Sequence, residues 1–212
     1  MELAILRTLC YHDIFDYPLT LKEIHRFLIG KKASLKKLQS IINHQSSIIN
    51  RNGFYFLKER EKIASLRKRR EKISRKKLAT AKRIAGWLRL IPTVKMVAIT
   101  GALAMENAKK DDDIDFLIVT GKNRLWLTRI QVVLLIELLA SRPQLEKRKL
   151  KDTICLNIFL DEDCFRMPKE KQNLFVAHEI AQMKPLWQKT NIYQKFLKEN
   201  QWVKKFLPNW SD

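Results

Sequence analysis

Hydrophobic positions in the first 57 residues recur with helical spacing in three stretches and then give way to a β-type pattern. The spacing predicts helices over residues 2–15, 20–29 and 34–45. Thr20 and Glu23 form a capping box at the start of the second helix. Asn52-Gly53 separates two short apolar runs, which indicates a tight hairpin. Three helices followed by a hairpin is the order of a winged helix, so residues 1–57 are assigned to a winged-helix-like domain.

Residues 58–90 carry a thin apolar stripe in a run of charged positions without proline, which predicts one long helix. The segment has 14 Lys and Arg against 3 Asp and Glu, a net charge of +11. The whole chain of 212 residues has 42 bases and 22 acids, a net charge of +20. More than half of the excess charge therefore lies in this basic connecting helix.

Such a helix is typical of a surface that binds phosphate groups. We expect it to contact nucleic acid or another polyanion through six bases, namely Lys68, Arg69, Arg70, Arg75, Lys76 and Lys77. An acidic protein partner would use the same surface, and a solvated linker helix is the alternative. In the winged helix, Lys36, Lys37, Gln39, Asn43 and His44 of the third helix and Arg51 of the wing are candidates for DNA contact. Winged helices also dock proteins, and the sequence leaves both possibilities open.

The centre of the chain carries the candidate chemistry. A buried strand over residues 94–100 is followed by Gly101, a short helix over residues 103–110, an acidic turn over residues 111–113 and a second strand over residues 114–120. Asp113 and Asp115 are two apart on an extended chain and so share one side. Paired carboxylates suit Mg²⁺, which prefers oxygen ligands and bridges them to substrate phosphates. Gly101 lets a phosphate approach the backbone, and the helix start adds backbone N–H donors.

This arrangement resembles the nucleotidyltransferase superfamily, whose minimal, polymerase-beta-like fold has a strand ending in glycine, a spacer of about ten residues and two aspartates in an alternating strand. Here the glycine is Gly101 and the pair lies in Asp113-Ile114-Asp115-Phe116. The resemblance covers residues 92–162 and implies an α+β fold. We expect a winged helix (1–57), a basic connecting helix (58–90), and a small mixed-sheet nucleotidyltransferase-like domain with C-terminal helices (91–212).

The sequence departs from the family pattern at two places. Ala102 stands where the family has serine or glycine. The family's third carboxylate belongs on a later strand, and the candidate strand over residues 153–160 offers Asn157 instead. An amide oxygen can ligate a metal but adds no negative charge.

The resemblance implies a metal-dependent enzyme that transfers an NMP from an NTP to an unknown acceptor, a nucleic acid or a protein. Catalysis and metal binding would fall to Asp113 and Asp115, with Asn157 as a third ligand to Mg²⁺ or Mn²⁺. The nucleotide would be held by Thr100, Gly101, Ala102, Lys109 and Lys110. The alternative is an inactive member of the fold that serves as a nucleic-acid-binding or regulatory adaptor.

The rest of the sequence argues against other classes of nucleotide-binding, metal-binding and membrane protein. No P-loop or Rossmann glycine pattern occurs, and Cys10, Cys155 and Cys164 lack the spacing of a zinc ribbon or a disulfide scaffold. The apolar stretch over residues 125–140 is too short for a membrane span and contains charges, so we expect a buried helix packed on the sheet. Helices are also expected over residues 168–182 and 191–207. The chain is expected to be cytoplasmic, with no membrane partner and an undefined oligomeric state.

Overall fold

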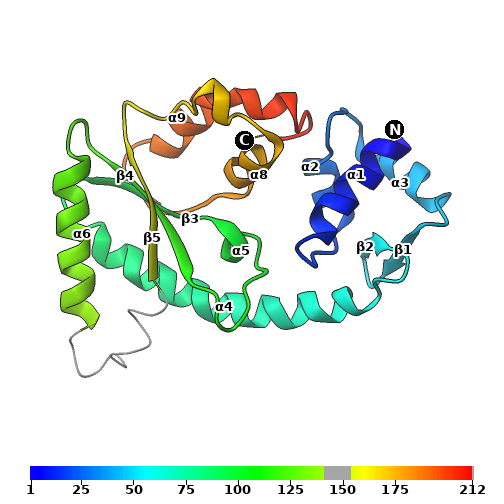
Figure 1. The fold of residues 1–212 in the computed structure, drawn as a ribbon, viewed down its shortest axis with the longest axis horizontal. Coiled ribbons are helices and arrows are strands. Elements are labelled where there is room, and N and C mark those ends of the chain that lie inside the picture. Colours follow the sequence, from blue (N-terminus) through cyan, green and yellow to red (C-terminus); the bar gives the residue numbers. More distant parts are fainter. Residues whose placement is uncertain (141–153, 212) are drawn as a thin grey trace. The chain divides into compact units, whose positions relative to one another are not determined.

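The computed structural model describes residues 1–140 and 154–211 as an α+β chain (Figure 1). The chain divides into two compact units. The N-terminal unit comprises Met1–Glu71, Pro168–Ala181 and Gln201–Asp212, and the sheet unit comprises Lys72–Met167 and Gln182–Asn200. The division falls between Glu71 and Lys72, within the expected connecting helix, and two C-terminal segments group with the N-terminal helices.

The N-terminal unit contains the winged helix expected from the sequence. Its elements are α1 (Glu2–Asp13), α2 (Leu21–Arg26), α3 (Leu35–Asn43), β1 (Ile48–Arg51) and β2 (Phe54–Leu57). The strands are antiparallel, and Asn52 and Gly53 between them both have positive φ, as a tight hairpin requires. Leu19, between α1 and α2, pairs with Tyr55 through two backbone hydrogen bonds of 3.0 and 2.7 Å. This isolated bridge ties the segment between α1 and α2 to the wing.

The C-terminal segments of the N-terminal unit pack on α1 and on the loop after α2. Helix α8 (Leu174–Gln182) places His178 against Tyr11 with ring centroids 4.0 Å apart. The backbone N–H of Gly30 donates to the carbonyl of Phe206 at 2.8 Å. The expected helix over residues 168–182 is replaced by a 3₁₀ turn (Lys169–Lys171) followed by α8, and the expected helix over 191–207 by α9 (Ile192–Glu199) and a 3₁₀ segment (Gln201–Lys205).

Helix α4 (Lys62–Leu88) is the long basic helix that the sequence predicts. Its first turns are tied to the N-terminal unit by buried arginines. Arg67 donates to the carboxylate of Glu23 at 2.8 Å and to Glu71 at 3.1 Å, and its guanidinium lies 4.2 Å from the ring centroid of Tyr17. Glu23 also completes the capping box with Thr20. The capping glutamate therefore has a second role, which is to neutralise a buried arginine.

The sheet unit is built on four strands in the order β5-β4-β3-β6. The strands are β3 (Val94–Ile99), β4 (Ile114–Thr120), β5 (Ile154–Asp161) and β6 (Lys184–Gln188). Strand β3 is antiparallel to both of its neighbours, and β4 is parallel to β5. The sequence did not predict β6, because Pro185 argues against a strand. Proline is tolerated there because β6 is an edge strand.

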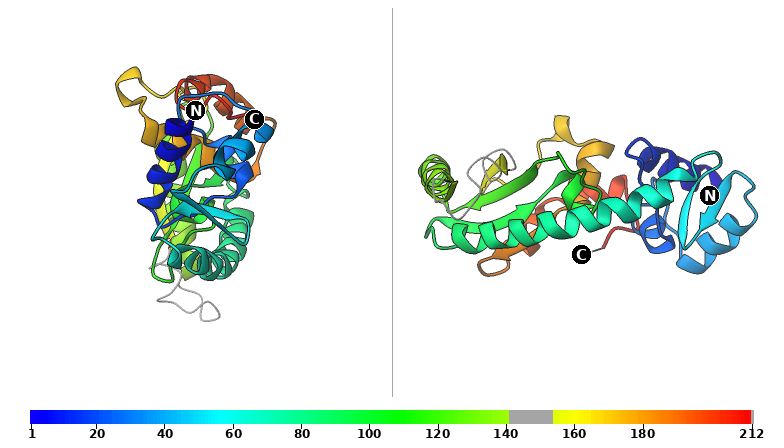
Figure 2. Two further views of the ribbon diagram at one scale, coloured as in Figure 1. Left: turned by 90° about the vertical axis from the view of Figure 1, so that its right-hand side faces the viewer. Right: turned by 90° about the horizontal axis from the view of Figure 1, so that it is seen from below.

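Two helices cover one face of the sheet (Figure 2). Ile84 and Leu88 of α4 and Val132 of α6 (Leu125–Ala140) pack with Phe116 and Ile118 of β4. Helix α9 contacts β3 and β6. Helix α5 has only four residues (Gly101–Ala104), shorter than the expected helix over residues 103–110.

Helix α6 is buried on only one side. Val132, Ile136 and Leu139 are buried, but six large apolar side chains on its other side are exposed, which corrects the expectation of a helix buried in the core. Among the residues that the structure describes, no helix combines the length and the apolar character that a membrane crossing needs.

Candidate functional site

Strand pairing brings the end of β3 to the start of β4 in the sheet unit. Ile99 pairs with Phe116, and the backbone N–H of Thr100 donates to the carbonyl of Asp115 at 3.1 Å. Because the two strands run antiparallel, the residues that follow β3 lie beside the first residues of β4. The corner made by Thr100 and Gly101 therefore meets the aspartate that the sequence singled out.

Gly101 is required at this corner for two separate reasons. Its φ is +62°, in the left-handed region where a side chain is strained. A Cβ at this position would also lie 2.9 Å from Oδ2 of Asp115. The glycine thus lets the backbone touch the carboxylate directly, which a larger residue prevents.

Helix α4 holds the acidic turn that precedes β4. The hydroxyl of Ser74 accepts a hydrogen bond from the backbone N–H of Ala108 at 3.0 Å, and Lys77 donates to the carbonyl of Asp112. The Asp112 carboxylate accepts from the N–H of Lys109 at 2.8 Å and so closes the turn. Lys77, expected to contact nucleic acid, instead supports this turn.

Asp113 and Asp115 lie at the beginning of β4, where Asp113 is exposed and Asp115 is half-buried. Burial raises the pKa of Asp115, and the neighbouring charges of Asp113 and Asp112 raise it further, against a hydrogen bond with Cys155 that lowers it. Burial also raises the pKa of the Cys155 thiol, with added contributions from Asp115 and Asp113. The site therefore concentrates negative charge, and a bound cation would relieve the repulsion.

The position opposite Asp115 on β5 is occupied by Cys155. The register shifts after this pair, so that Leu117 is opposite Ile158, and Asn157 falls in the irregular stretch with its side chain exposed. The sequence pointed to Asn157 as the third polar position, since a bulge cannot be read from alternation. In the described part of the chain, no group of three or more His, Cys, Asp or Glu is arranged to hold a metal ion.

The other predicted nucleotide contacts are distributed around the same corner. Thr100 is buried, and within residues 1–140 and 154–211 its hydroxyl has no hydrogen-bond partner. Ala102 lies in α5 directly after Gly101, and Lys109 and Lys110 are exposed in the loop before the acidic turn. The structure thus places all five predicted residues on the chain between β3 and β4.

The predicted polyanion contacts on α4 do not share one environment. Arg70 is buried and donates to the carbonyl of Phe15 at 3.0 Å and to Asp16 at 3.3 Å, so it is engaged within the N-terminal unit. The exposed members of the set are Lys68, Arg69, Arg75 and Lys76. Sequence periodicity alone does not separate an arginine that pairs with an acid from one that faces solvent.

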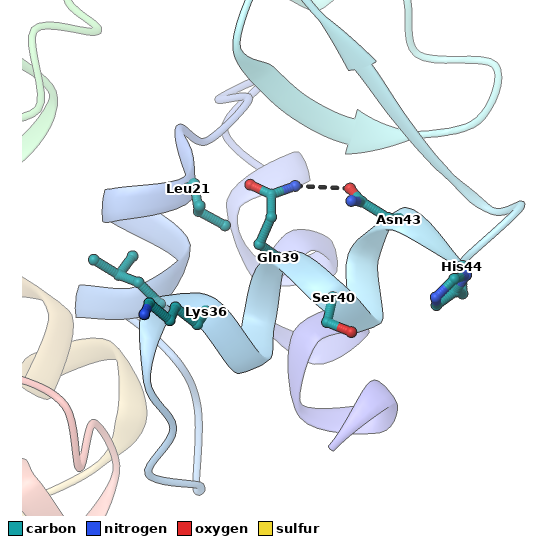
Figure 3. A pocket seen from close by; sticks show the side chains of 7 residues that line it. Leu21, Lys36, Gln39, Ser40, Asn43 and His44 are labelled. Atoms are coloured by element: carbon teal, nitrogen blue, oxygen red, sulfur yellow. Dashed lines mark hydrogen bonds between the residues drawn. The ribbon is translucent and has the colours of Figure 1, made fainter.

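A shallow groove runs along α3 in the N-terminal unit (Figure 3). Its polar side chains are preorganised, because Nε2 of Gln39 donates to Oδ1 of Asn43 at 2.7 Å and the hydroxyl of Tyr55 donates to Gln39 at 3.3 Å. The groove is lined by Leu21, Leu35, Lys36, Gln39, Ser40, Asn43 and His44. Four of these residues are among the candidates for DNA contact on the third helix.

No protein-family model matches the chain, and no curated protein matches it. Among solved structures, one described as the crystal structure of a toxin-antitoxin with AMP-PNP is similar with a TM-score of 0.35 and 15% sequence identity. The match covers 58% of this chain and 89% of that chain. A likeness of this strength carries no argument about function, so the proposals below rest on the residues of this chain.

Proposed function

We propose that the chain is a metal-dependent nucleotidyltransferase that transfers an NMP from an NTP to a hydroxyl of a nucleic acid or a protein and releases pyrophosphate. The observation that carries the proposal is the contact of Gly101 with Asp115, where a Cβ would lie 2.9 Å from Oδ2. A strand end, a glycine in the left-handed region and an aspartate of the next strand meet there. This is the arrangement by which the sequence resembles the nucleotidyltransferase superfamily.

The residues at this corner fit a divalent cation. Asp113 and Asp115 supply carboxylate oxygens, the ligands that Mg²⁺ and Mn²⁺ prefer. The hydroxyl of Thr100, directly before Gly101, is buried and has no hydrogen-bond partner in the described part of the chain. When bound, such an ion supplies charge neutralisation at the phosphates and activation of an attacking hydroxyl.

The chain's own residues have distinct roles in this proposal. Asp113 and Asp115 hold the cation, and Gly101 leaves room for the Asp115 carboxylate against the backbone. Lys109 and Lys110 are exposed on the adjoining loop and are available to offset the negative charge of a triphosphate. Lys77 acts through the carbonyl of Asp112 and fixes the turn that presents Asp113.

Label transfer from an NTP tests this proposal. The full chain is incubated with Mg²⁺ or Mn²⁺ and each NTP labelled at the α-phosphate, in the presence of RNA, DNA and the protein itself as acceptors. We expect transfer that is lost in Asp113→Asn and Asp115→Asn but retained in Asp111→Asn, an exposed acid of the same turn. The proposal is contradicted if all three variants transfer label equally. It is also contradicted if the wild type shows neither label transfer nor metal-dependent NTP binding.

The second candidate function is a nucleic-acid-binding adaptor, and two observations favour it. Cys155 stands opposite Asp115 where a third carboxylate would be useful, and its raised pKa keeps the thiol uncharged at neutral pH. In addition, residues 24–58, which contain α3 and the wing, include no acidic residue. The seven bases of this segment are Arg26, Lys31, Lys32, Lys36, Lys37, Arg51 and Lys58.

Three acids of the N-terminal unit, Asp13, Asp16 and Glu23, are engaged by arginines just before or within α4. Arg60 donates to Asp13 and Asp16, each at 2.7 Å, and Arg67 neutralises Glu23. The positive charge of α3 and the wing therefore has little local compensation, which favours binding of a polyanion.

Salt dependence of binding tests the adaptor function. Fluorescence anisotropy of labelled duplex DNA and RNA is measured against the full chain over a series of KCl concentrations. The double variants Lys36→Gln/Lys37→Gln and Arg75→Gln/Lys76→Gln are expected to weaken binding and to lower the salt slope by about one for each phosphate that is no longer neutralised. Lys198→Gln, an exposed lysine of α9, is the control. Affinity that does not depend on salt removes this function.

A further inference from the structure

Helix α6 is apolar around most of its circumference, but the described residues of the chain bury only one side of it. Val132, Ile136 and Leu139 face the core, and Val132 and Ile136 belong to the main hydrophobic cluster. The opposite side is exposed at six large apolar residues: Trp126 at 72%, Leu127 at 44%, Ile130 at 59%, Val133 at 41%, Leu134 at 63% and Leu138 at 58%. A helix that is hydrophobic on all sides is normally buried on all sides.

The exposed apolar face of α6, formed by these six residues, is large enough to form an interface. With roughly 200 Å² of accessible surface for a large apolar residue, their exposed fractions amount to about 700 Å². The largest apolar patch of a typical monomer is about 300–600 Å². Two such faces packed together would bury about 1,400 Å², within the range of about 1,200–2,000 Å² for stable specific interfaces.

We propose that this face packs against the same face of a second copy of the chain, with the two α6 helices antiparallel. The charges on α6 support this arrangement. Arg129 and Glu137 are the helix's only charged residues, both are exposed, and they lie four residues before and four residues after Val133. In an antiparallel pair centred on Val133, each Arg129 lies level with Glu137 of the other copy. The two pairs are then about 12 Å apart along the helix axis, from a rise of 1.5 Å per residue.

The position of these charges around the helix agrees with the same pairing. At 100° per residue, Arg129, Val133 and Glu137 fall on the same edge of the exposed apolar face. A two-fold antiparallel pair brings that edge of one helix against the identical edge of the other. The balanced charge of α6 also argues for a protein surface over an anionic membrane, which selects helices rich in Lys and Arg.

Sedimentation of the full chain over a concentration series tests the proposal. The wild type is expected to form a dimer, and Leu134→Glu is expected to shift it to a monomer at the same concentration. Leu90→Glu is the matched control, because Leu90 is 71% exposed and lies outside α6. Circular dichroism spectra and melting curves that match the wild type would show that the variants are folded.

Charge reversal tests the antiparallel register. Arg129→Glu alone is expected to raise the dimer Kd by about tenfold or more. Adding Glu137→Arg in the same chain is expected to restore the affinity of the dimer, because both ion pairs re-form with their charges exchanged. A wild type that is monomeric up to about 100 μM, a typical weak-dimer limit, overturns the proposal. A dimer that survives Leu134→Glu overturns it as well, and a double variant without rescue overturns the register.

Discussion

Replacing Gly101 by alanine perturbs the fold and the candidate site at the same atom. A Cβ there would lie 2.9 Å from Oδ2 of Asp115, closer than real Cβ contacts, so the carboxylate has to turn away. The backbone φ of +62° adds strain for any residue with a side chain. Together these effects are expected to destabilise the sheet unit by about 1–3 kcal/mol.

The size of the effect is measurable by thermal unfolding. For a chain of this length, each kcal/mol lowers the melting temperature by about 2–4 °C. Gly86→Ala is the matched control, because Gly86 lies within α4 and no atom stands within 4 Å of a Cβ at that position. Alanine is the better helix former, so Gly86→Ala is expected to stabilise the protein by about 0.5–1 kcal/mol. The two alanine substitutions therefore have opposite signs.

A third variant separates backbone strain from the contact with Asp115. Asparagine tolerates the left-handed region better than alanine does, but it carries the same Cβ. Gly101→Asn is therefore expected to recover part of the lost stability and none of the lost metal-dependent NTP binding. Binding is measured by titrating a fluorescent NTP analogue with Mn²⁺. If Gly101→Ala is as stable as the wild type and binds NTP equally well, the argument that Gly101 shapes the site is refuted.

Three further outcomes follow from the structure. Cys155→Asp supplies a third carboxylate beside the two aspartates and is expected to tighten Mn²⁺ binding by about tenfold or more, because affinity rises with ligand charge. Calorimetric titration with Mn²⁺ measures this affinity, and an unchanged affinity would show that Cys155 is not part of the site. Arg67→Met leaves the half-buried carboxylate of Glu23 without its cation and is expected to cost about 3 kcal/mol in urea unfolding, whereas Lys68→Met at the exposed neighbour stays within about 0.5 kcal/mol. Burial lowers the pKa of His12 to about 4 and that of His178 to about 3. Below pH 6.5 the unfolded chain binds more protons than the folded one. The free energy of unfolding therefore has its full value above that pH and falls by up to about 2 kcal/mol per histidine between pH 6.5 and pH 5. A urea midpoint that does not change over this range contradicts the lowered pKa of these histidines.

Local sequence signals predicted the elements that local chemistry determines. The capping box of Thr20 and Glu23 and the hairpin turn at Asn52-Gly53 depend on residues within four positions of one another, and both are present as expected. The turn at Gly101 was also predicted, and Gly101 has a positive φ there, but its close contact with Asp115 was not predicted.

Features that depend on distant partners were not predictable from local pattern. Strand β6 contains Pro185, and only its place at the edge of the sheet makes that proline acceptable. Arg70 looked like its exposed neighbours on α4 until the fold brought Asp16 to it. On β5 Cys155 is opposite Asp115, and the register shift that follows puts Ile158 rather than Asn157 opposite Leu117; a one-residue shift of this kind leaves no trace in the alternation of polar and apolar residues.

The distribution of ion pairs gives a physical reason to expect a cation at the candidate site. The chain has 20 more basic than acidic residues, so basic partners for its acids are abundant. Glu23 is paired with Arg67, and Asp13 with Arg60. Asp113 and Asp115, like Asp111 and Asp112 of the same turn, form no ion pair within residues 1–140 and 154–211, and the charges of Asp113 and Asp112 raise the pKa of Asp115. Repulsion between neighbouring carboxylates opposes folding unless something positive offsets it. A cation bound at this turn would offset the repulsion that Asp113 exerts on Asp115.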